Sequence, residues 1–328
     1  MTQTEVLKPL KTWSHLAGRR RKPSEYEIVS TNLHFSTDNP EAPFELDPNF
    51  PMARWYKEHR NASPWVHPDW NAFRDPDEIV YRTYNMLQDG QETYVFGLLN
   101  QFSERGHDSM LERSWAATLA RLYSPGRYLF HALQMGSAYL TQIAPASTIS
   151  NCAAYQTGDS LRWLTHTAYR TKELSLTFPD LGFGANERNL WEQHPAWQGW
   201  RSLVEQALVA WDWAEAFVAM NLVVRPAVEE TVLRGLGQAA RHNGDTLLGM
   251  LTDAQLLDAE RHRRWACALV KMAQGQADND KVIKGWIAKW EPLADKAIEA
   301  YCASLPDVPN AAADAIAATR RFRSSIGL

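Results

Sequence analysis

The chain has few cysteines, no long apolar run and no excess of positive charge. Its three cysteines, Cys152, Cys267 and Cys302, form no Cys-x-x-Cys pair, which argues against a disulfide framework and a thiolate metal site. The net charge is −4 with both signs mixed, so a phosphate-binding surface is not indicated. No run approaches the ~18 apolar residues of a membrane span, and no signal-peptide pattern occurs. We therefore expect a cytoplasmic protein without nucleic-acid or membrane partners.

The sequence also lacks the alternating pattern of β-strands, and helical patterns dominate from Asp75 onward. Start signals such as Pro125 after Ser124, and turn signals such as "NGD" at 243–245, divide these patterns. We expect an all-α fold, with a helical domain over 76–305 and a loosely attached C-terminal tail, 306–328, that contains a short Ala-rich helix. The expected helices span 76–104, 107–123, 125–143, 147–175, 186–194, 196–223, 225–242, 245–274, 279–288 and 290–304.

Residues 1–75 differ from the rest because they are rich in proline and aromatic residues and poor in helical periodicity. Such a segment is too aromatic for a disordered linker, so we expect an extended N-terminal arm that lies over a surface. Its rings either pack on the chain's own bundle or contact another subunit, and the sequence leaves both open. The candidate anchors are Phe35, Phe44, Phe50, Trp55, Tyr56, Trp65, Trp70 and Phe73.

The helices carry little of what a di-iron site in a bundle needs, namely a Glu from each of two helices and a Glu-x-x-His from each of two others. No Asp or Glu occurs from Arg113 through Gly158. One literal Glu-x-x-His, Glu104 and His107, contains Gly106, where we expect a helix to end, so a surface charge pair or a helix-end histidine is favoured. No Ser-His-Asp or Cys-His arrangement is indicated either. We therefore expect no catalytic, cofactor-binding or metal-binding residue.

The stretch "QLLDAERHRRWACAL", residues 255–269, comes closest to a metal-binding helix. Ala259, however, stands three residues before His262, and Glu260 points away from the face of the histidine. We expect His262 to be buried and bonded by Asp258.

Two further inward positions depart from a metal-binding pattern. Asp159 and Arg162 have the metal-site spacing, but a guanidinium cannot ligate a metal, so we expect a buried ion pair. On 205–222 the inward stripe, which includes Trp211, centres on Ala214, and it offers no carboxylate.

Several long motifs resemble the beta subunit of the hydroxylase in bacterial toluene and aromatic monooxygenases, members of the bacterial multicomponent monooxygenase family. They are "KPSEYEIVS", "WYKEHRNASP", "DPDEIVYRTYNMLQDGQETYV", "APASTISNCAAYQTGDSLRWLTHTAYRTKELS" and "DAERHRRW". The resemblance covers roughly residues 10–304. It implies a ferritin-like, ribonucleotide-reductase-like helical bundle that has lost its iron ligands. It also implies that Ala214 and Ala259 replace two glutamates, and that Asp159 and Arg162 stand where the alpha subunit has Glu and His, leaving a vestigial site beside His262.

The same resemblance implies the partners. The hydroxylase would be a dimer of three-subunit protomers, with a di-iron centre in the alpha subunit and a gamma subunit beside it. Electrons from NADH would pass through a flavin reductase and a Rieske ferredoxin, and a small effector protein would tune the reaction. We thus expect a non-catalytic structural beta subunit of an aromatic-ring monooxygenase. The alternative is a free-standing helical metal-dependent oxidase, which the lack of ligands disfavours.

Overall fold

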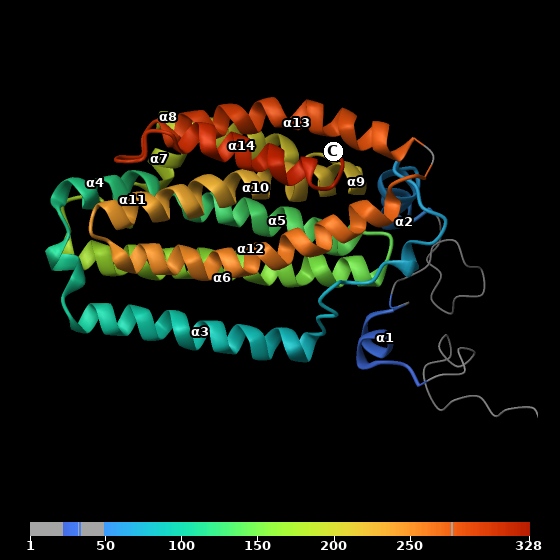
Figure 1. The fold of residues 1–328 in the computed structure, drawn as a ribbon, viewed down its shortest axis with the longest axis horizontal. Coiled ribbons are helices and arrows are strands. Elements are labelled where there is room, and N and C mark those ends of the chain that lie inside the picture. The colour runs from blue at the N-terminus through green and yellow to red at the C-terminus, as the bar shows by residue number, and fades with distance from the viewer. Residues whose placement is uncertain (1–21, 32, 34–48, 277) are drawn as a thin grey trace, which may run out of the picture.

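The computed structural model describes residues 22–31, 33, 49–276 and 278–328, and every regular element in these ranges is a helix (Figure 1). The all-α expectation is confirmed. Among the described helices, none combines the length and apolar character needed to cross a bilayer. The longest are α3 (Tyr81–Glu104), α5 (Gly126–Ile143), α6 (Ser147–Thr177), α12 (Thr246–Ala273) and α13 (Asn279–Cys302). The shorter ones are α1 (Glu25–Ser30), α2 (Pro51–Tyr56), α4 (Arg113–Leu122), α7 (Glu187–Gln193), α8 (Pro195–Ala207), α9 (Trp213–Phe217), α10 (Arg225–Val228), α11 (Leu236–His242) and α14 (Ala311–Ser324).

The long helices lie side by side along one axis (Figure 1). α3 forms one edge of the bundle, α6 and α12 lie above it, and α5 follows, with α8, α13 and α14 at the opposite side. The interior is apolar and aromatic: Trp197 and Trp200 of α8 are fully buried against Tyr301 of α13. Trp197 Nε1 donates to the carbonyl of Arg121 at 2.8 Å and the Tyr301 hydroxyl to the carbonyl of Leu122 at 3.0 Å, whereas Trp200 Nε1 has no partner among the described residues. Ring burial of this kind supplies much of the folding free energy.

The expected helix 196–223 is interrupted in the structure. α8 ends at Ala207, and Asp212 caps the next helix by accepting hydrogen bonds from the backbone N–H groups of Ala214 and Glu215 at 2.9 and 3.0 Å. An aspartate that bonds the backbone in this way starts a new helix rather than continuing the old one. Trp211 therefore lies in the break and is 41% exposed, whereas we had expected it on the inward stripe.

The expected start of a helix at residue 225 is also wrong, because the chain stays helical from Trp213 to His242 through two π-helical stretches, Val218–Val224 and Glu229–Gly235. Pro226 has no N–H, so it cannot make the α-helical hydrogen bond to the carbonyl of Leu222, four residues earlier. Arg323 of α14 supplies a donor instead, with its Nη1 3.3 Å from that oxygen.

Residues 279–302 likewise form one helix, α13, with Pro292 inside it, rather than the two expected segments 279–288 and 290–304.

The C-terminal tail is packed rather than loose. Its Ala-rich helix, α14, buries Ala315, Thr319 and Arg323 against the bundle. Arg320 adds an ion pair to Asp295 of α13 at 2.8 Å. The apolar residues along one face of α14 explain this docking, because removing them from water against a neighbouring helix is favourable.

The described part of the N-terminal region contains two short helices, α1 and α2, where we expected an extended chain. Of the candidate anchors, Phe35 and Phe44 lie outside the described residues. Trp65 and Phe73 are fully buried in the chain's own core, and Trp65 stacks on Phe217 with ring centroids 5.7 Å apart. Phe50, in contrast, is 55% exposed. Residues 55–73 therefore act as part of the bundle.

Candidate functional site

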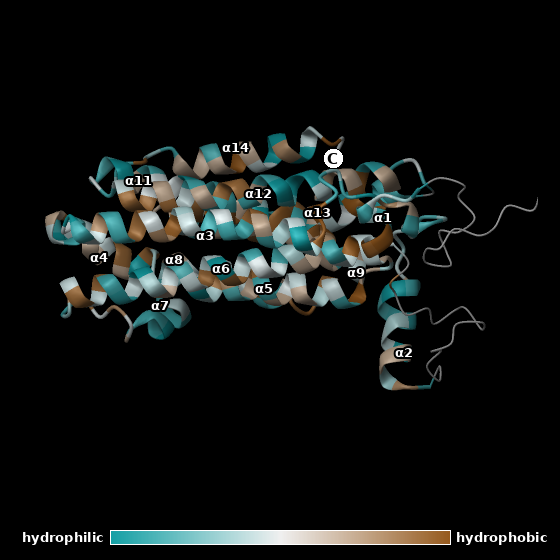
Figure 2. Ribbon diagram, turned by 90° about the horizontal axis from the view of Figure 1, so that it is seen from below, coloured by the Kyte–Doolittle hydropathy of each residue, from teal (hydrophilic) through white to brown (hydrophobic). Residues whose placement is uncertain are grey.

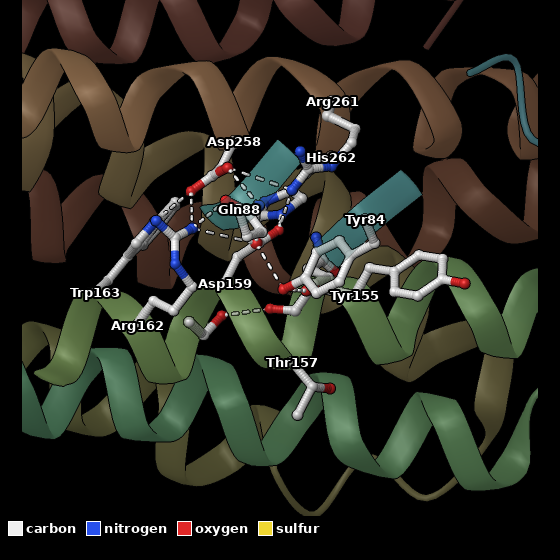
Figure 3. Close-up of polar contacts among 12 residues, drawn as sticks. Tyr84, Gln88, Tyr155, Thr157, Asp159, Arg162, Trp163, Asp258, Arg261 and His262 are labelled. Atoms are coloured by element: carbon white, nitrogen blue, oxygen red, sulfur yellow. Dashed lines mark hydrogen bonds and ion pairs between the residues drawn. The ribbon is translucent and has the colours of Figure 1, made fainter. Parts of the chain in front are cut away.

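A buried polar network connects α3, α6 and α12 (Figure 3). Each helix contributes residues that share one face, such as Asp258, Arg261 and His262 at positions i, i+3 and i+4 of α12. We call this cluster the interhelix network. Its members are Tyr84, Gln88, Asp159, Arg162, Trp163, Asp258, Arg261 and His262.

Asp159 is fully buried and accepts hydrogen bonds from four side chains. Its Oδ1 accepts from the Tyr84 hydroxyl at 3.0 Å and from Gln88 Nε2 at 2.7 Å. Its Oδ2 accepts from Arg261 Nη2 and lies 2.7 Å from His262 Nε2. The carboxylate is thus fully engaged, as a buried charge must be.

The expected ion pair between Asp159 and Arg162 is present, but Arg261 is the closer cation of Asp159. Arg162 Nη1 lies 3.7 Å from Asp159 Oδ1, an ion-pair distance but longer than a hydrogen bond. Its guanidinium instead donates to Glu92 Oε1 at 2.5 Å and to Asp258 Oδ2 at 3.2 Å. The long Arg162 side chain extends past the fully buried Asp159 toward the rim of the network, where 17% of it is exposed.

His262 is buried as expected, but its partner is Asp159 rather than Asp258. Its other ring nitrogen, Nδ1, has no hydrogen-bond partner. Burial, reinforced by the nearby charges of Arg225 and Arg261, holds the pKa of His262 well below its ordinary range. The imidazole is therefore neutral, and we assign the proton to Nε2, which faces the carboxylate.

Arg225 forms a second buried layer beside this network. Its Nη2 donates to Ser137 Oγ at 2.6 Å and Ser160 Oγ at 2.8 Å, and no carboxylate among the described residues lies within ion-pair distance of it. Burial lowers the pKa of Arg225 to about 10, so it keeps its charge at neutral pH. A third cation thus faces the region of His262.

The donor set does not suit a di-iron centre. The oxygens of Asp159 and Asp258 are held by guanidinium, amide and indole donors, and a guanidinium can neither ligate a metal nor tolerate one beside it. Within the described ranges, no group of three or more His, Cys, Asp or Glu side chains is placed to hold a metal ion. The two alanines of the expected vestigial site, Ala214 and Ala259, are buried in apolar clusters and offer no ligand.

The literal Glu-x-x-His pair is separated in space by a helix end. Glu104 is the last residue of α3, and Gly106 adopts the left-handed conformation with φ of 64°, as expected for a helix stop. His107 then turns inward, and its Nε2 lies 3.1 Å from Oδ1 of the buried Asp245. His107 is a buried residue with a satisfied ring, not half of a ligand pair.

Three members of the network, Tyr84, Gln88 and Arg261, had not been identified from the sequence. Gln88 bridges both carboxylates, donating to Asp159 and to Asp258 (3.1 Å) while its Oε1 accepts from Arg162 at 2.5 Å. A polar residue on the buried stripe of α3, which also holds Val95 and Leu99, is the signal that could have revealed it.

The family described as Methane/Phenol/Alkene Hydroxylase matches residues 55–277. The chain belongs to this family. A protein of Ectopseudomonas mendocina named as the beta subunit of the hydroxylase component of the toluene-4-monooxygenase system is 62% identical over 301 residues, which is 92% of each chain. The oxygenase component DmpL of phenol 2-monooxygenase from Pseudomonas sp. strain CF600 is 26% identical over 70% of this chain and 69% of that protein.

Solved structures agree. One of toluene 4-monooxygenase with toluene in its resting active site superposes with a TM-score of 0.87 and 61% identity, covering 92% of this chain and 99% of the matched chain. Phenol hydroxylase from Pseudomonas sp. OX1 superposes with a TM-score of 0.83 at 21% identity, over 100% of this chain and 98% of the other, which establishes a shared fold. The resemblance predicted from the sequence motifs is confirmed, and the chain is related to subunits of multicomponent hydroxylases.

Proposed function

We propose that this chain is the non-catalytic beta-type subunit of a toluene or related aromatic monooxygenase hydroxylase. The observation that carries the proposal is its 62% identity, over 92% of its length, to a hydroxylase beta subunit. The interhelix network adds a physical argument, since the arginines at Arg162 and Arg261 occupy the carboxylate oxygens that a metal would need. Its role would be to support a catalytic subunit rather than to activate dioxygen.

The proposal includes partners that the resemblance implies. An alpha subunit would carry the di-iron centre, and it would assemble with this chain and a gamma subunit into a dimer of three-subunit protomers. Effector protein, Rieske ferredoxin and NADH-dependent flavin reductase would complete the system. The cytoplasm is the proposed compartment, because all three cysteines are free thiols in the structure, as a reducing environment favours.

The test is co-expression of the tagged chain with the reading frames beside its own. We expect the chain to co-purify with at least one other subunit, and the complex to hydroxylate toluene when supplied with its electron-transfer proteins. Omission of this chain should abolish assembly and turnover. If the chain alone bound iron and consumed dioxygen with a reductant, it would be the free-standing oxidase instead.

A further inference from the structure

The outward side of α3 is unusual for a surface helix. α3 lies at the edge of the bundle, and Figure 2 views it from the side that faces away from α6 and α12. It buries Gln88, Val95, Leu98 and Leu99 inward. At about 100° per residue, the opposite side is formed by a different set. We call this set the outer face of α3, and it comprises Met86, Leu87, Gly90, Thr93, Tyr94, Gly97 and Gln101, all exposed.

This face exposes large apolar side chains, with Met86 68%, Tyr94 47% and Leu87 41% accessible. Charged residues of the same helix border it: Asp89 and Glu104 are also exposed, and Arg82 pairs with Glu25 at 2.7 Å. Glu92 instead pairs with Arg162 beside the interhelix network. Exposed apolar side chains gathered in this way mark a contact surface.

Two glycines interrupt the same face, Gly90 and Gly97, seven residues or about two turns apart. A Cβ added at either position would meet no atom within 4 Å, and neither has a positive φ. Nothing within the described chain therefore requires glycine here, although glycine weakens a helix interior relative to alanine. The requirement comes from outside, because a missing Cβ allows another backbone to approach closely.

We propose that the outer face of α3 packs against the apolar face of a helix of another subunit of the hydroxylase. This inference rests on the function proposed above. The two notches two turns apart match the repeat of a helix, and the exposed Met86, Leu87 and Tyr94 require an apolar surface to cover them. The occupant is a different subunit because a close relative bears the name of one subunit of a larger hydroxylase component. The apolar surface also continues onto α6, where Tyr169 is half-exposed and in edge contact with Phe96.

The test uses Gly90→Gln with Gly97→Gln in the co-expressed complex. Glutamine is a good helix former and meets open space at both positions, so the free chain should melt at or above the wild-type temperature. In the complex the same side chains would separate the two helices, and we expect at least a ten-fold loss of co-purified partner. Tyr94→Glu, which leaves the glycines intact, should reduce recovery in the same direction.

The matched control is Gly285→Gln on α13, where an added Cβ also meets no atom within 4 Å. It should leave the recovery of the complex unchanged, and the free chain should again melt at or above the wild-type temperature. Wild-type recovery of the double glycine variant would overturn the inference while leaving the proposed function intact. If the wild-type chain recovered no partner at all, the proposed function would fail, and the inference with it.

Experiments on the free chain test two other ways of covering this face, by a second copy of the chain or by another segment of the same chain. Sedimentation should find the wild-type chain monomeric; a dimer that the glycine substitutions dissociate would identify a second copy and overturn the proposal. The rate of Met86 oxidation by peroxide reports coverage directly. We expect fast oxidation in the free monomer and at least ten-fold slower oxidation in the complex, with Met135 on α5 as the reference. Slow oxidation of Met86 in the free monomer would mean that another segment of this chain covers the face.

Discussion

Asp159 is held by residues from all three helices of the interhelix network, so its charge depends on the whole arrangement. Two of its donors, Gln88 and Tyr84, come from α3, and the other two, Arg261 and His262, come from α12. A buried ion pair of this kind is costly to form and more costly to break on one side.

Replacing Asp159 alone should therefore be severe. Asp159→Leu leaves Arg261 buried without its main carboxylate, and Arg261→Met leaves Asp159 buried without its main cation. Each change should lower the free energy of unfolding by ~3–5 kcal/mol. The double variant should recover much of this loss, because both charges leave together. Urea unfolding of the four proteins in a double-mutant cycle measures the coupling. The cycle of Asp159→Leu with Arg162→Met should show weaker coupling, and equal coupling in both cycles would contradict the assignment of Arg261 as the principal partner.

The neutral state of His262 predicts a pH dependence of stability. Because its folded pKa lies well below the ordinary value of about 6.5, the unfolded chain takes up this proton first as the pH falls. Its contribution is fully present above about pH 7 and is lost below about 6.5, by ~1.4 kcal/mol per pH unit. Against His262→Gln, the stability advantage of the wild type should therefore shrink as the pH falls from 7 to 5. An unchanged difference across that range would show that the imidazole is not held neutral.

The inward placement of Asp159, Arg162 and His262 could be predicted from helical spacing, and the structure confirms it. Their pairing could not. Arg261 and His262 lie about 100° apart on either side of Asp258, so spacing puts both near one face but does not say whether Arg261 or Arg162 pairs with Asp159. Periodicity places Cβ atoms, whereas the reach of an arginine depends on what the neighbouring helices leave open.

At the scale of helices, α8 and α13 approach most closely at Gly199. A Cβ at this position would lie 2.6 Å from Ala297 Cα, a backbone atom that cannot move aside without moving its helix. Gly199→Ala should therefore lower the free energy of unfolding by about 1–3 kcal/mol, since overpacking outweighs the gain in helix propensity. Gly285→Ala on α13, with open space around it, should instead raise stability by about 0.5–1 kcal/mol. Thermal denaturation distinguishes the two, and a stabilising Gly199→Ala would show that the helices are not in contact there.

The long helices could be predicted from hydrophobic period, but their interruptions could not. Helix boundaries were expected near both prolines, at residues 225 and 288–290, yet Pro226 and Pro292 lie inside continuous helices; π-type turns flank Pro226, and Arg323 donates to the carbonyl of Leu222 beside it. Conversely, the break before Trp213 has an ordinary signal, Asp212, that a strong apolar pattern on both sides concealed.

For the whole molecule, we predict that this chain holds no iron, alone or in its complex. Arg162 and Arg261 occupy the carboxylates and would repel a cation, and Arg225 adds a third positive charge. Anomalous scattering at the iron edge on crystals of the assembled hydroxylase should give peaks in a partner subunit only. A peak between α6 and α12 of this chain would contradict both this prediction and the structural role.

The N-terminal arm is the second prediction at this scale. Residues 55–73 pack on the bundle. Any contact that the N-terminal arm makes with another subunit must therefore come largely from the residues before them. Deleting residues 1–45 removes α1 but not the buried Trp65 and Phe73, and circular dichroism should still report a helical chain. We expect this truncated chain to lose co-purification with its partners. Recovery equal to that of the full chain would assign the arm no part in assembly.

The hydrogen bond from Arg323 to the carbonyl of Leu222 ties the C-terminal helix to the middle of the sequence in an evolutionary sense as well. Pro226 has no N–H to donate to that oxygen, and the arginine of the C-terminal helix donates to it. A lineage that replaced the proline with alanine would restore the helical N–H and free the tail to diverge or disappear. A lineage that lost the tail first would leave an unsatisfied carbonyl in the core. The order in which the two changes can occur is therefore constrained by a single acceptor atom.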